Sequence, residues 1–359
     1  AAPALEEEAP RYCRSLQDSA LAAREMLAQI GPALGRLNGG IAFHRDVNAR
    51  NLLVFAPEGE PGKQAGAGPS EASELEFSLL DFGSSTDARA WVGNAEGSWA
   101  VENPTGDARY WGPASWTRFL GTAKALVQDP LLCCQYVRRL DMFALGICAL
   151  ELLAKLHAPV CPSGAILCGW EASLVQASER LRGSWAAYWK LAVASFERLA
   201  EYSRLMCNGD QQGSAQVWQE LSYGSLPQRL AELLGRLCGD LEATAEACGS
   251  LAERPWATQA ECGRWLQARG ALRMLREMVD VGGSMEWGEL AAGLAEPRVA
   301  ARLVDQPGPE RVAEPLADAQ RPSAAAGGHP WGPSAGAGSG AQAAPPGAEG
   351  AEAAEAAEA

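Results

Sequence analysis

Basic residues and long apolar runs are both scarce in this chain. Its 359 residues include 30 Lys and Arg against 44 Asp and Glu, which gives a net charge of −14. Because nonspecific nucleic-acid binding and attachment to anionic membranes both require a basic surface, we expect neither kind of partner. The longest apolar stretch, Met142 to Leu156, is interrupted by Glu151 and is shorter than the roughly 20 residues that span a bilayer. A membrane-spanning segment is therefore not expected.

Targeting signals and paired cysteine motifs are also missing. The sequence opens with AAPALEEEAP, which is acidic where the start of a signal peptide is basic. The 10 Cys include no C-x-x-C pair, and only 3 His accompany them. This pattern predicts reduced, mostly buried thiols and a cytoplasmic protein. The first residue is not Met, which indicates a processed or truncated chain.

Composition divides the chain into a body, 1–304, and a tail, 305–359. The tail is rich in Pro, Gly, Ala and Glu with almost no large apolar residues, which predicts disorder. In the body, apolar residues at three- and four-residue steps predict helices, and short apolar runs predict strands. The expected helices cover 15–36, 142–156, 171–202 and 226–241, and the expected strands cover 41–43, 52–55 and 77–80. Residues 57–74 predict a surface loop, because they are rich in Gly, Pro and Glu.

Two polar motifs follow these short strands. Residues 44–51 read HRDVNARN after the first strand, and Asp81-Phe82-Gly83 ends the third. Seven specified letters coincide by chance in about one alignment in 10⁹, and this chain offers only some tens of thousands of alignments. The chain here resembles the protein kinase family, whose catalytic loop reads H-R-D-x-x-x-x-N and whose metal-binding turn reads D-F-G.

The resemblance implies a protein-kinase-like α+β fold, represented by its predominantly helical large lobe, in which short β-hairpins carry the catalytic loop. It also implies ATP and Mg²⁺ as cofactors and phosphoryl transfer to a hydroxyl group of a protein substrate. By the resemblance, Asp46 is the catalytic base, and His44 and Arg45 complete the catalytic triplet. Asn51 and Asp81 are the implied Mg²⁺ ligands, since Mg²⁺ prefers oxygen donors.

The same resemblance implies the residues that contact the nucleotide. Leu53 would lie beneath the adenine, and Asn51, Phe82 and Gly83 would complete the binding surface. The rings of His44 and Phe82 would stack behind the metal turn. Gly83 would allow the backbone to turn sharply after the metal ligand.

Two later segments extend the resemblance. Asp141-Met142-Phe143-Ala144-Leu145-Gly146 resembles the D-x-[WF]-x-x-G opening of the family's central helix, whose Asp holds the catalytic loop backbone. Residues 106–113, GDARYWGP, resemble the end of the activation segment. Arg45 would then sense a phosphorylated residue in that segment, because a guanidinium pairs well with a dianion. Thr105 is the expected phosphorylation site, by its distance from Pro113.

Three departures from the family pattern qualify the expected function. No Gly-rich loop precedes His44 and no Lys occurs in residues 1–43, so the small β-rich lobe is expected to be encoded upstream of Ala1 or to be absent. Ala114 stands where the family has Glu, and Asn48 stands where serine/threonine kinases have Lys. The residue type that accepts the phosphate, Ser or Thr against Tyr, stays open.

Three functions are compatible with these observations. The first is an ATP-dependent protein kinase, represented here by its catalytic large lobe. The second is a non-catalytic pseudokinase or scaffold that binds partners through the helical lobe, which the missing Lys and Glu favour. The third is a small-molecule phosphotransferase of kinase-like fold, ranked last because such proteins commonly lack a counterpart of Arg45.

Overall fold

Helices account for most of the described part of the chain. The computed structural model describes residues 3–55, 75–93, 97–157, 169–223, 225–253 and 258–295. These residues all belong to one compact unit. The expected tail, 305–359, and the expected loop, 57–74, lie outside the described residues.

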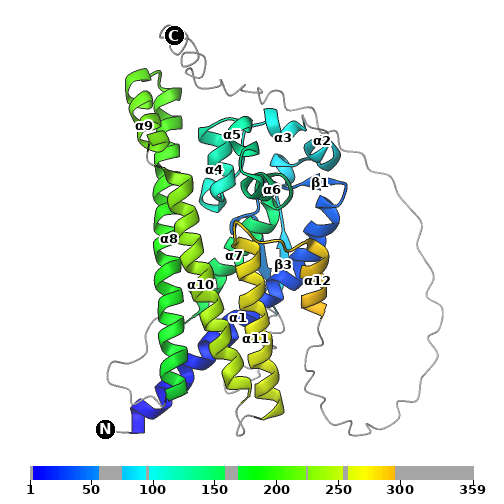
Figure 1. Cartoon of the computed structure of the whole chain (residues 1–359), viewed down its shortest axis with the longest axis vertical. Helices are drawn as coiled ribbons and strands as arrows, with labels where there is room; N and C mark the ends of the chain where they lie inside the picture. The colour runs from blue at the N-terminus through cyan, green and yellow to red at the C-terminus, as the bar shows by residue number, and fades with distance from the viewer. Residues whose placement is uncertain are drawn as a thin grey trace, which may run out of the picture. The chain divides into compact units, whose positions relative to one another are not determined.

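Long helices pack side by side and form the body of the molecule (Figure 1). They are α1 (Pro3–Asn38), α7 (Leu140–Leu156), α8 (Gly169–Cys207), α10 (Leu226–Ala252) and α11 (Gln259–Val279). Helix α10 packs against both α8 and α11, while α7 packs against α1 and α11. The four helices expected from the sequence all lie within these longer ones, so the prediction of a mostly helical body is confirmed.

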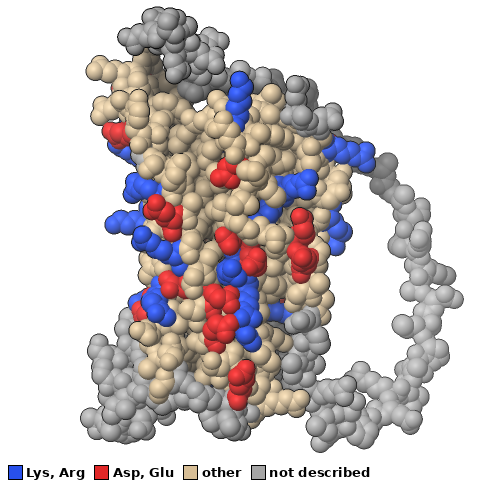
Figure 2. All heavy atoms as spheres, viewed as in Figure 1, with Lys and Arg blue, Asp and Glu red and all other residues tan. Residues whose placement is uncertain are grey.

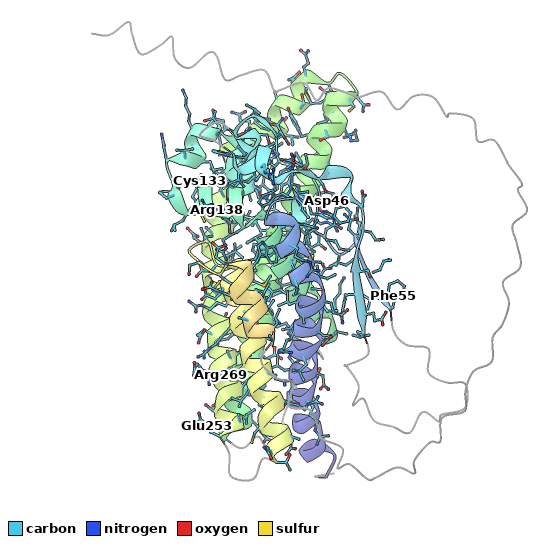
Figure 3. All side chains as sticks on the ribbon, turned by 90° about the vertical axis from the view of Figure 1, so that its right-hand side faces the viewer. Asp46, Phe55, Cys133, Arg138, Glu253 and Arg269 are labelled. Carbon is cyan, nitrogen blue, oxygen red and sulfur yellow. The ribbon has the colours of Figure 1, made fainter. Side chains whose placement is uncertain are left out.

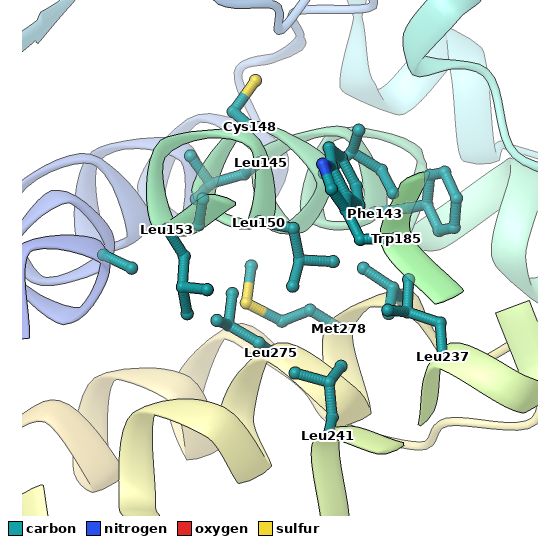
Figure 4. Close-up of a cluster of buried hydrophobic side chains, with 14 of the residues drawn as sticks. Phe143, Leu145, Cys148, Leu150, Leu153, Trp185, Leu237, Leu241, Leu275 and Met278 are labelled. Carbon is teal, nitrogen blue, oxygen red and sulfur yellow. The ribbon is translucent and has the colours of Figure 1, made fainter. Parts of the chain in front are cut away.

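The apolar character of α7 places it at the centre of the larger hydrophobic core. Its Leu150 and Leu153 face Leu275 and Met278 of α11 in the close-up of Figure 4. At Gly146 a Cβ would lie 2.9 Å from Val279 Cγ1, which explains why the close approach of α7 and α11 requires glycine there. The central helix is therefore fixed in position by its neighbours along its length.

Shorter helices surround a second, smaller core (Figure 1). They are α2 (Ala88–Val92), α3 (Ser98–Val101), α4 (Pro113–Leu120), α5 (Ala123–Val127) and α6 (Pro130–Arg138). Phe43, Trp91, Leu126 and Tyr136 are buried in this core. Two more helices, α9 (Gln211–Tyr223) and α12 (Trp287–Ala295), pack on α8 and on α1 respectively.

Four short strands form two separate antiparallel pairs. Strand β1 (Ala42–Phe43) pairs with β4 (Thr86–Asp87), and β2 (Leu52–Phe55) pairs with β3 (Glu76–Leu79). The expectation that the strands flanking residues 44–51 form one hairpin is wrong, because β1 and β2 belong to different sheets. Loop 44–51, which lies between β1 and β2, thus connects one sheet to the other.

The surface over α10 and α11 carries interleaved opposite charges (Figure 2). Arg273 lies 3.0 Å from Glu242, and it also pairs with Glu246. Such exposed pairs contribute about 0–1 kcal/mol each, so these pairs add little to stability. In the described helices no segment is both long and apolar enough to cross a membrane.

Candidate functional site

Loop 44–51 is anchored to the core through Asp141 at the start of α7. One carboxylate oxygen accepts hydrogen bonds from the backbone N–H of His44 at 2.7 Å and from Asn38 Nδ2 at 2.8 Å. The other oxygen accepts from the backbone N–H of Arg45 at 2.8 Å. Asp141 is only 1% exposed, so these donors satisfy a carboxylate that water does not reach. The contact that the sequence resemblance implied between this Asp and the loop backbone is present.

The two cores also hold the loop at its beginning. Phe43 is buried in the smaller core, and Val47 is buried in the larger one. The turn between them is therefore pinned on both sides. Asp46 lies within this turn, at the side of the molecule seen on the right in Figure 3.

The Asp46 carboxylate is oriented by neutral donors. Its Oδ1 accepts from Asn48 Nδ2 at 2.7 Å and from the backbone N–H of Asp107 at 2.9 Å. Its Oδ2 accepts from Asn51 Nδ2 at 3.2 Å. Asn51 Nδ2 also donates to the Asp46 backbone carbonyl at 2.9 Å, so the amide group of Asn51 is turned toward Asp46.

Gly106 allows the segment that follows to approach Asp46 closely. Its φ is +86°, and a Cβ there would lie 2.6 Å from the Arg45 carbonyl oxygen and 2.7 Å from Asp46 Oδ1. Only glycine fits such a position without displacing the loop. The match of residues 106–113 to an activation segment therefore coincides with a steric requirement beside the candidate base.

His44 supports the loop from beneath. Its Nδ1 accepts a hydrogen bond from the Asp46 backbone N–H at 3.3 Å, which assigns the ring proton to Nε2. Nε2 lies 3.1 Å from the Leu80 carbonyl oxygen and donates to it. The His44 and Phe82 rings pack at 4.7 Å between centroids. The expected ring contact is thus present. His44 is only 1% exposed, and it holds the backbone of loop 44–51 from the interior.

The turn that begins at Asp81 lies directly beside the loop. The Leu80 backbone N–H donates to the Asn51 carbonyl at 2.8 Å, which ties the end of β3 to the loop. Asp81 Oδ1 accepts from the Gly83 N–H at 3.0 Å. Within the described part of the chain, no donor reaches Asp81 Oδ2 or Asn51 Oδ1. These two oxygens are available to a ligand.

The expectation that Gly83 supplies the sharp turn is wrong. The left-handed residue is Asp81, with φ 59° and ψ 79°, whereas Gly83 lies in the 3-10 turn Phe82–Ser84 without a positive φ. Aspartate tolerates this conformation because its short side chain can bond to the nearby backbone, as the bond to the Gly83 N–H illustrates.

Backbone strain is concentrated at the candidate site. Among the described residues, the non-glycine residues with positive φ are Arg45, Asp81 and Ser225. Two of these three lie in the loop and the turn. A left-handed conformation costs roughly 1–2 kcal/mol for most residues, and such strain persists where the surrounding structure requires a special geometry. The distribution of strain therefore points to the same residues as the sequence motifs.

The Arg45 guanidinium already has an anionic partner. It pairs with the Glu102 carboxylate, donates to the Asn103 carbonyl at 3.2 Å, and lies 4.9 Å from the centre of the Trp91 ring. The Thr105 Oγ1, expected as the phosphorylation site, is buried and has no partner among the described residues. Phosphorylation there would require the segment to open. Glu102 is thus the anion that pairs with Arg45, where the sequence predicts a phosphate group.

The segment 102–114 is braced by contacts that do not involve a Glu at position 114. Ala114 is buried, and its N–H donates to Gln135 Oε1 at 3.2 Å. Tyr110 donates to Glu151 Oε2 at 2.6 Å, and burial raises the pKa of Tyr110 far above its usual value. A Cβ at Gly112 would lie 3.0 Å from the Phe143 ring. Packing and hydrogen bonds, one of them to the Glu151 carboxylate, thus brace this segment without a Glu at position 114.

Apolar side chains next to the site are exposed. Leu53 is 39% exposed on β2, where it pairs with Ser78, and Phe82 is 49% exposed. Phe55, at the far end of β2, is 51% exposed and projects from the ribbon in Figure 3. Contiguous exposed apolar surface of this kind marks a candidate binding surface.

The donor set fits Mg²⁺ held together with phosphate groups. In the described ranges, no group of three or more His, Cys, Asp or Glu side chains could hold a metal ion by itself. Mg²⁺ commonly uses only one or two carboxylates and takes its other oxygens from phosphates and water. The free oxygens of Asp81 and Asn51 would supply the protein's share.

Loop 44–51 and the adjoining turn contain the residues that the sequence singled out, which are His44, Arg45, Asp46, Asn51 and Asp81. The sequence did not indicate the pairing of Glu102 with Arg45 or the inward orientation of Asn48. Both depend on tertiary contacts that no local pattern reports. Comparison with known proteins adds no further assignment, because no family model, curated protein or solved structure matches this chain. The resemblance to protein kinases therefore rests on the motif residues of the sequence alone.

Proposed function

We propose that loop 44–51 and the turn 81–83 form the phosphoryl-transfer site of an ATP- and Mg²⁺-dependent protein kinase. The observation that carries the proposal is the orientation of Asp46, Asn51 and Asp81. Neutral donors orient the Asp46 carboxylate, while Asn51 Oδ1 and Asp81 Oδ2 have no donor in the described chain. Loop 44–51 and the adjoining turn 81–83 thus present a candidate catalytic base and two oxygens that could coordinate a metal ion.

Each residue then has a definite task. Asp46 accepts the proton of a substrate hydroxyl as its oxygen attacks the γ-phosphorus of ATP. The bond from that phosphorus to the bridging oxygen breaks, and ADP departs with the electron pair. Asp81 and Asn51 would hold Mg²⁺, which would supply charge neutralisation for the triphosphate. Leu53 and Phe82 offer apolar surface to the adenine of ATP. Asp141 holds the backbone of loop 44–51 in place.

Transfer of radiolabelled phosphate from ATP to a protein substrate tests the proposal. The assay uses the protein expressed from its own transcript. Asp46→Asn should slow transfer by about 10²–10⁴-fold, the usual effect of losing a positioned base. Asp81→Asn should abolish Mg²⁺-dependent turnover. Asp87→Asn is the matched control, because Asp87 caps α2 nearby and Asn caps a helix equally well. Equal activity in all three variants would refute the assignment. Peptides bearing Ser, Thr or Tyr in the same assay identify the acceptor.

A non-catalytic scaffold is the second candidate. It is favoured by Ala114 at the family's Glu position and by the absence of Lys from residues 1–43. In that case the wild type and Asp81→Asn would bind partner proteins equally, and neither would transfer phosphate. The upstream transcript also separates the two: a Gly-rich strand pair followed by a V-A-I-K-like strand, in frame, supports the kinase.

A further inference from the structure

Asn48 is buried, with 3% of its surface exposed, and every polar atom of its amide is used. Nδ2 donates to Asp46 Oδ1 at 2.7 Å and to the Asp46 carbonyl at 3.1 Å. Oδ1 accepts from the backbone N–H of Arg50 at 2.8 Å and of Asn51 at 3.2 Å. The amide orientation is unambiguous, because its oxygen faces two donors and its nitrogen faces two acceptors.

The two oxygens of the Asp46 carboxylate have different surroundings. Oδ1 accepts two hydrogen bonds, from Asn48 and from the Asp107 N–H, and Gly106 lies against it. Each carboxylate oxygen has about two lone-pair positions, so Oδ1 is fully used. Oδ2 accepts one bond, the 3.2 Å contact from Asn51, and keeps one position open.

We propose that Asn48 is a positioning residue that occupies Asp46 Oδ1, so that Oδ2 is the oxygen that receives the substrate's proton. The inference rests on the proposed function and adds to it by assigning the reacting atom and the residue that selects it. A Lys at position 48 could not play this part, because it has no acceptor for the Arg50 and Asn51 N–H groups. Asn48, which departs from the family pattern, thus orients the Asp46 carboxylate in a way that Lys could not.

The kinetics of phosphoryl transfer by the full chain, resolved into kcat and KM for ATP, test this role. Asn48→Ala should lower kcat by about tenfold and leave KM for ATP within about twofold, because Asp46 Oδ2 is no longer held toward the substrate hydroxyl. Asn103→Ala is the matched control: Asn103 is exposed and contacts Arg45 through its backbone carbonyl only. It should leave kcat unchanged.

A purely structural role for Asn48 would lower the unfolding temperature and leave the kcat of the folded protein unchanged, and that result would overturn the proposal. Asn48→Asp covers the case in which the Ala variant does not fold. It keeps an acceptor for the Arg50 and Asn51 N–H groups and replaces the donor to Asp46 with a carboxylate. Its kcat should fall at least as far as that of Asn48→Ala, with KM for ATP within about twofold of the wild-type value. A kcat equal to that of the wild type would overturn the proposal as well.

The two proposals fail in distinguishable ways. Absence of phosphate transfer by the wild-type protein would remove the proposed function and, with it, the role of Asn48. An unchanged kcat in the Asn48 variants, together with normal transfer by the wild type, would remove only the role of Asn48.

Discussion

Asp141 joins the candidate loop to the central helix, and Asp141→Asn is the substitution that tests this connection most cleanly. The Asn side chain keeps the size of Asp but offers one acceptor oxygen in place of two. If that oxygen takes the place of Oδ2, the bonds from His44 and Asn38 persist, and the amide nitrogen then faces the Arg45 N–H. One hydrogen bond is lost and two lose their charge assistance.

The magnitude follows from these three bonds. A hydrogen bond to a charged group contributes about 1.5–3 kcal/mol, against about 0.5–1.5 kcal/mol for a neutral one. Losing one charged bond and weakening two others costs roughly 3–5 kcal/mol, and easier burial of the neutral amide offsets part of that. We expect the free energy of unfolding to fall by about 2–4 kcal/mol.

Two measurements check this expectation. Urea denaturation gives the free energy of unfolding, and amide hydrogen exchange reports the His44 and Arg45 N–H groups directly. Both amides should exchange faster in the variant. Asp129→Asn is the matched control, because Asp129 caps α6 at the surface and Asn serves equally well there. Unchanged protection of His44 and Arg45, or an equal cost in the control, would refute the reasoning.

The remaining predictions concern other buried charges. Glu102→Gln should cost about 1–2 kcal/mol in urea denaturation, because buried Arg45 loses its anion. Glu220→Gln breaks the exposed pair with Arg198 and should cost much less; equal costs in the two variants would contradict this. Arg139→Met should cost about 2–4 kcal/mol, because its guanidinium bonds to carbonyls at the end of α11, while exposed Arg138→Met should cost little in the same assay. Burial and the nearby Arg182 lower the pKa of His157 from 6.5 to about 4, so between these two pH values His157 is protonated in the unfolded chain and neutral in the folded one. Stability should therefore fall by about 2–3 kcal/mol as the pH drops from 6.5 to 4, and His157→Gln should remove this slope; an unchanged slope would exclude His157 as its source.

The sequence predicted the long elements well because their periodicity is strong. Residues 15–36 lie inside α1, and residues 142–156 nearly coincide with α7. The strand segments were also found, but their pairing was not. The partner of β1 is β4, a two-residue strand that carries no alternating pattern. Pairing of such short strands is decided by tertiary packing, which a local pattern does not record.

The candidate site was predictable in part for a similar reason. His44, Asp46 and Asp81 stand in letter patterns that can be recognised without a structure. Glu102 lies in an irregular segment and reaches Arg45 across 57 positions of the chain, so nothing near it in the sequence marks its role. The sharp turn lies at Asp81 rather than at Gly83, and there the Asp81 side chain accepts a hydrogen bond from the Gly83 N–H, a local contact that the letter pattern does not report.

Paramagnetic broadening by Mn²⁺ with ADP tests the central claim most directly, since Mn²⁺ substitutes for Mg²⁺ at oxygen sites and broadening detects weak binding. We predict selective broadening of the Asn51 and Gly83 amide signals in the full chain, with Gly249 of α10 unaffected. Asp81→Asn should abolish the selective effect. No selective broadening in the wild type, or the same pattern in Asp81→Asn, would contradict the assignment of loop 44–51 and the turn at Asp81 as a metal–nucleotide site.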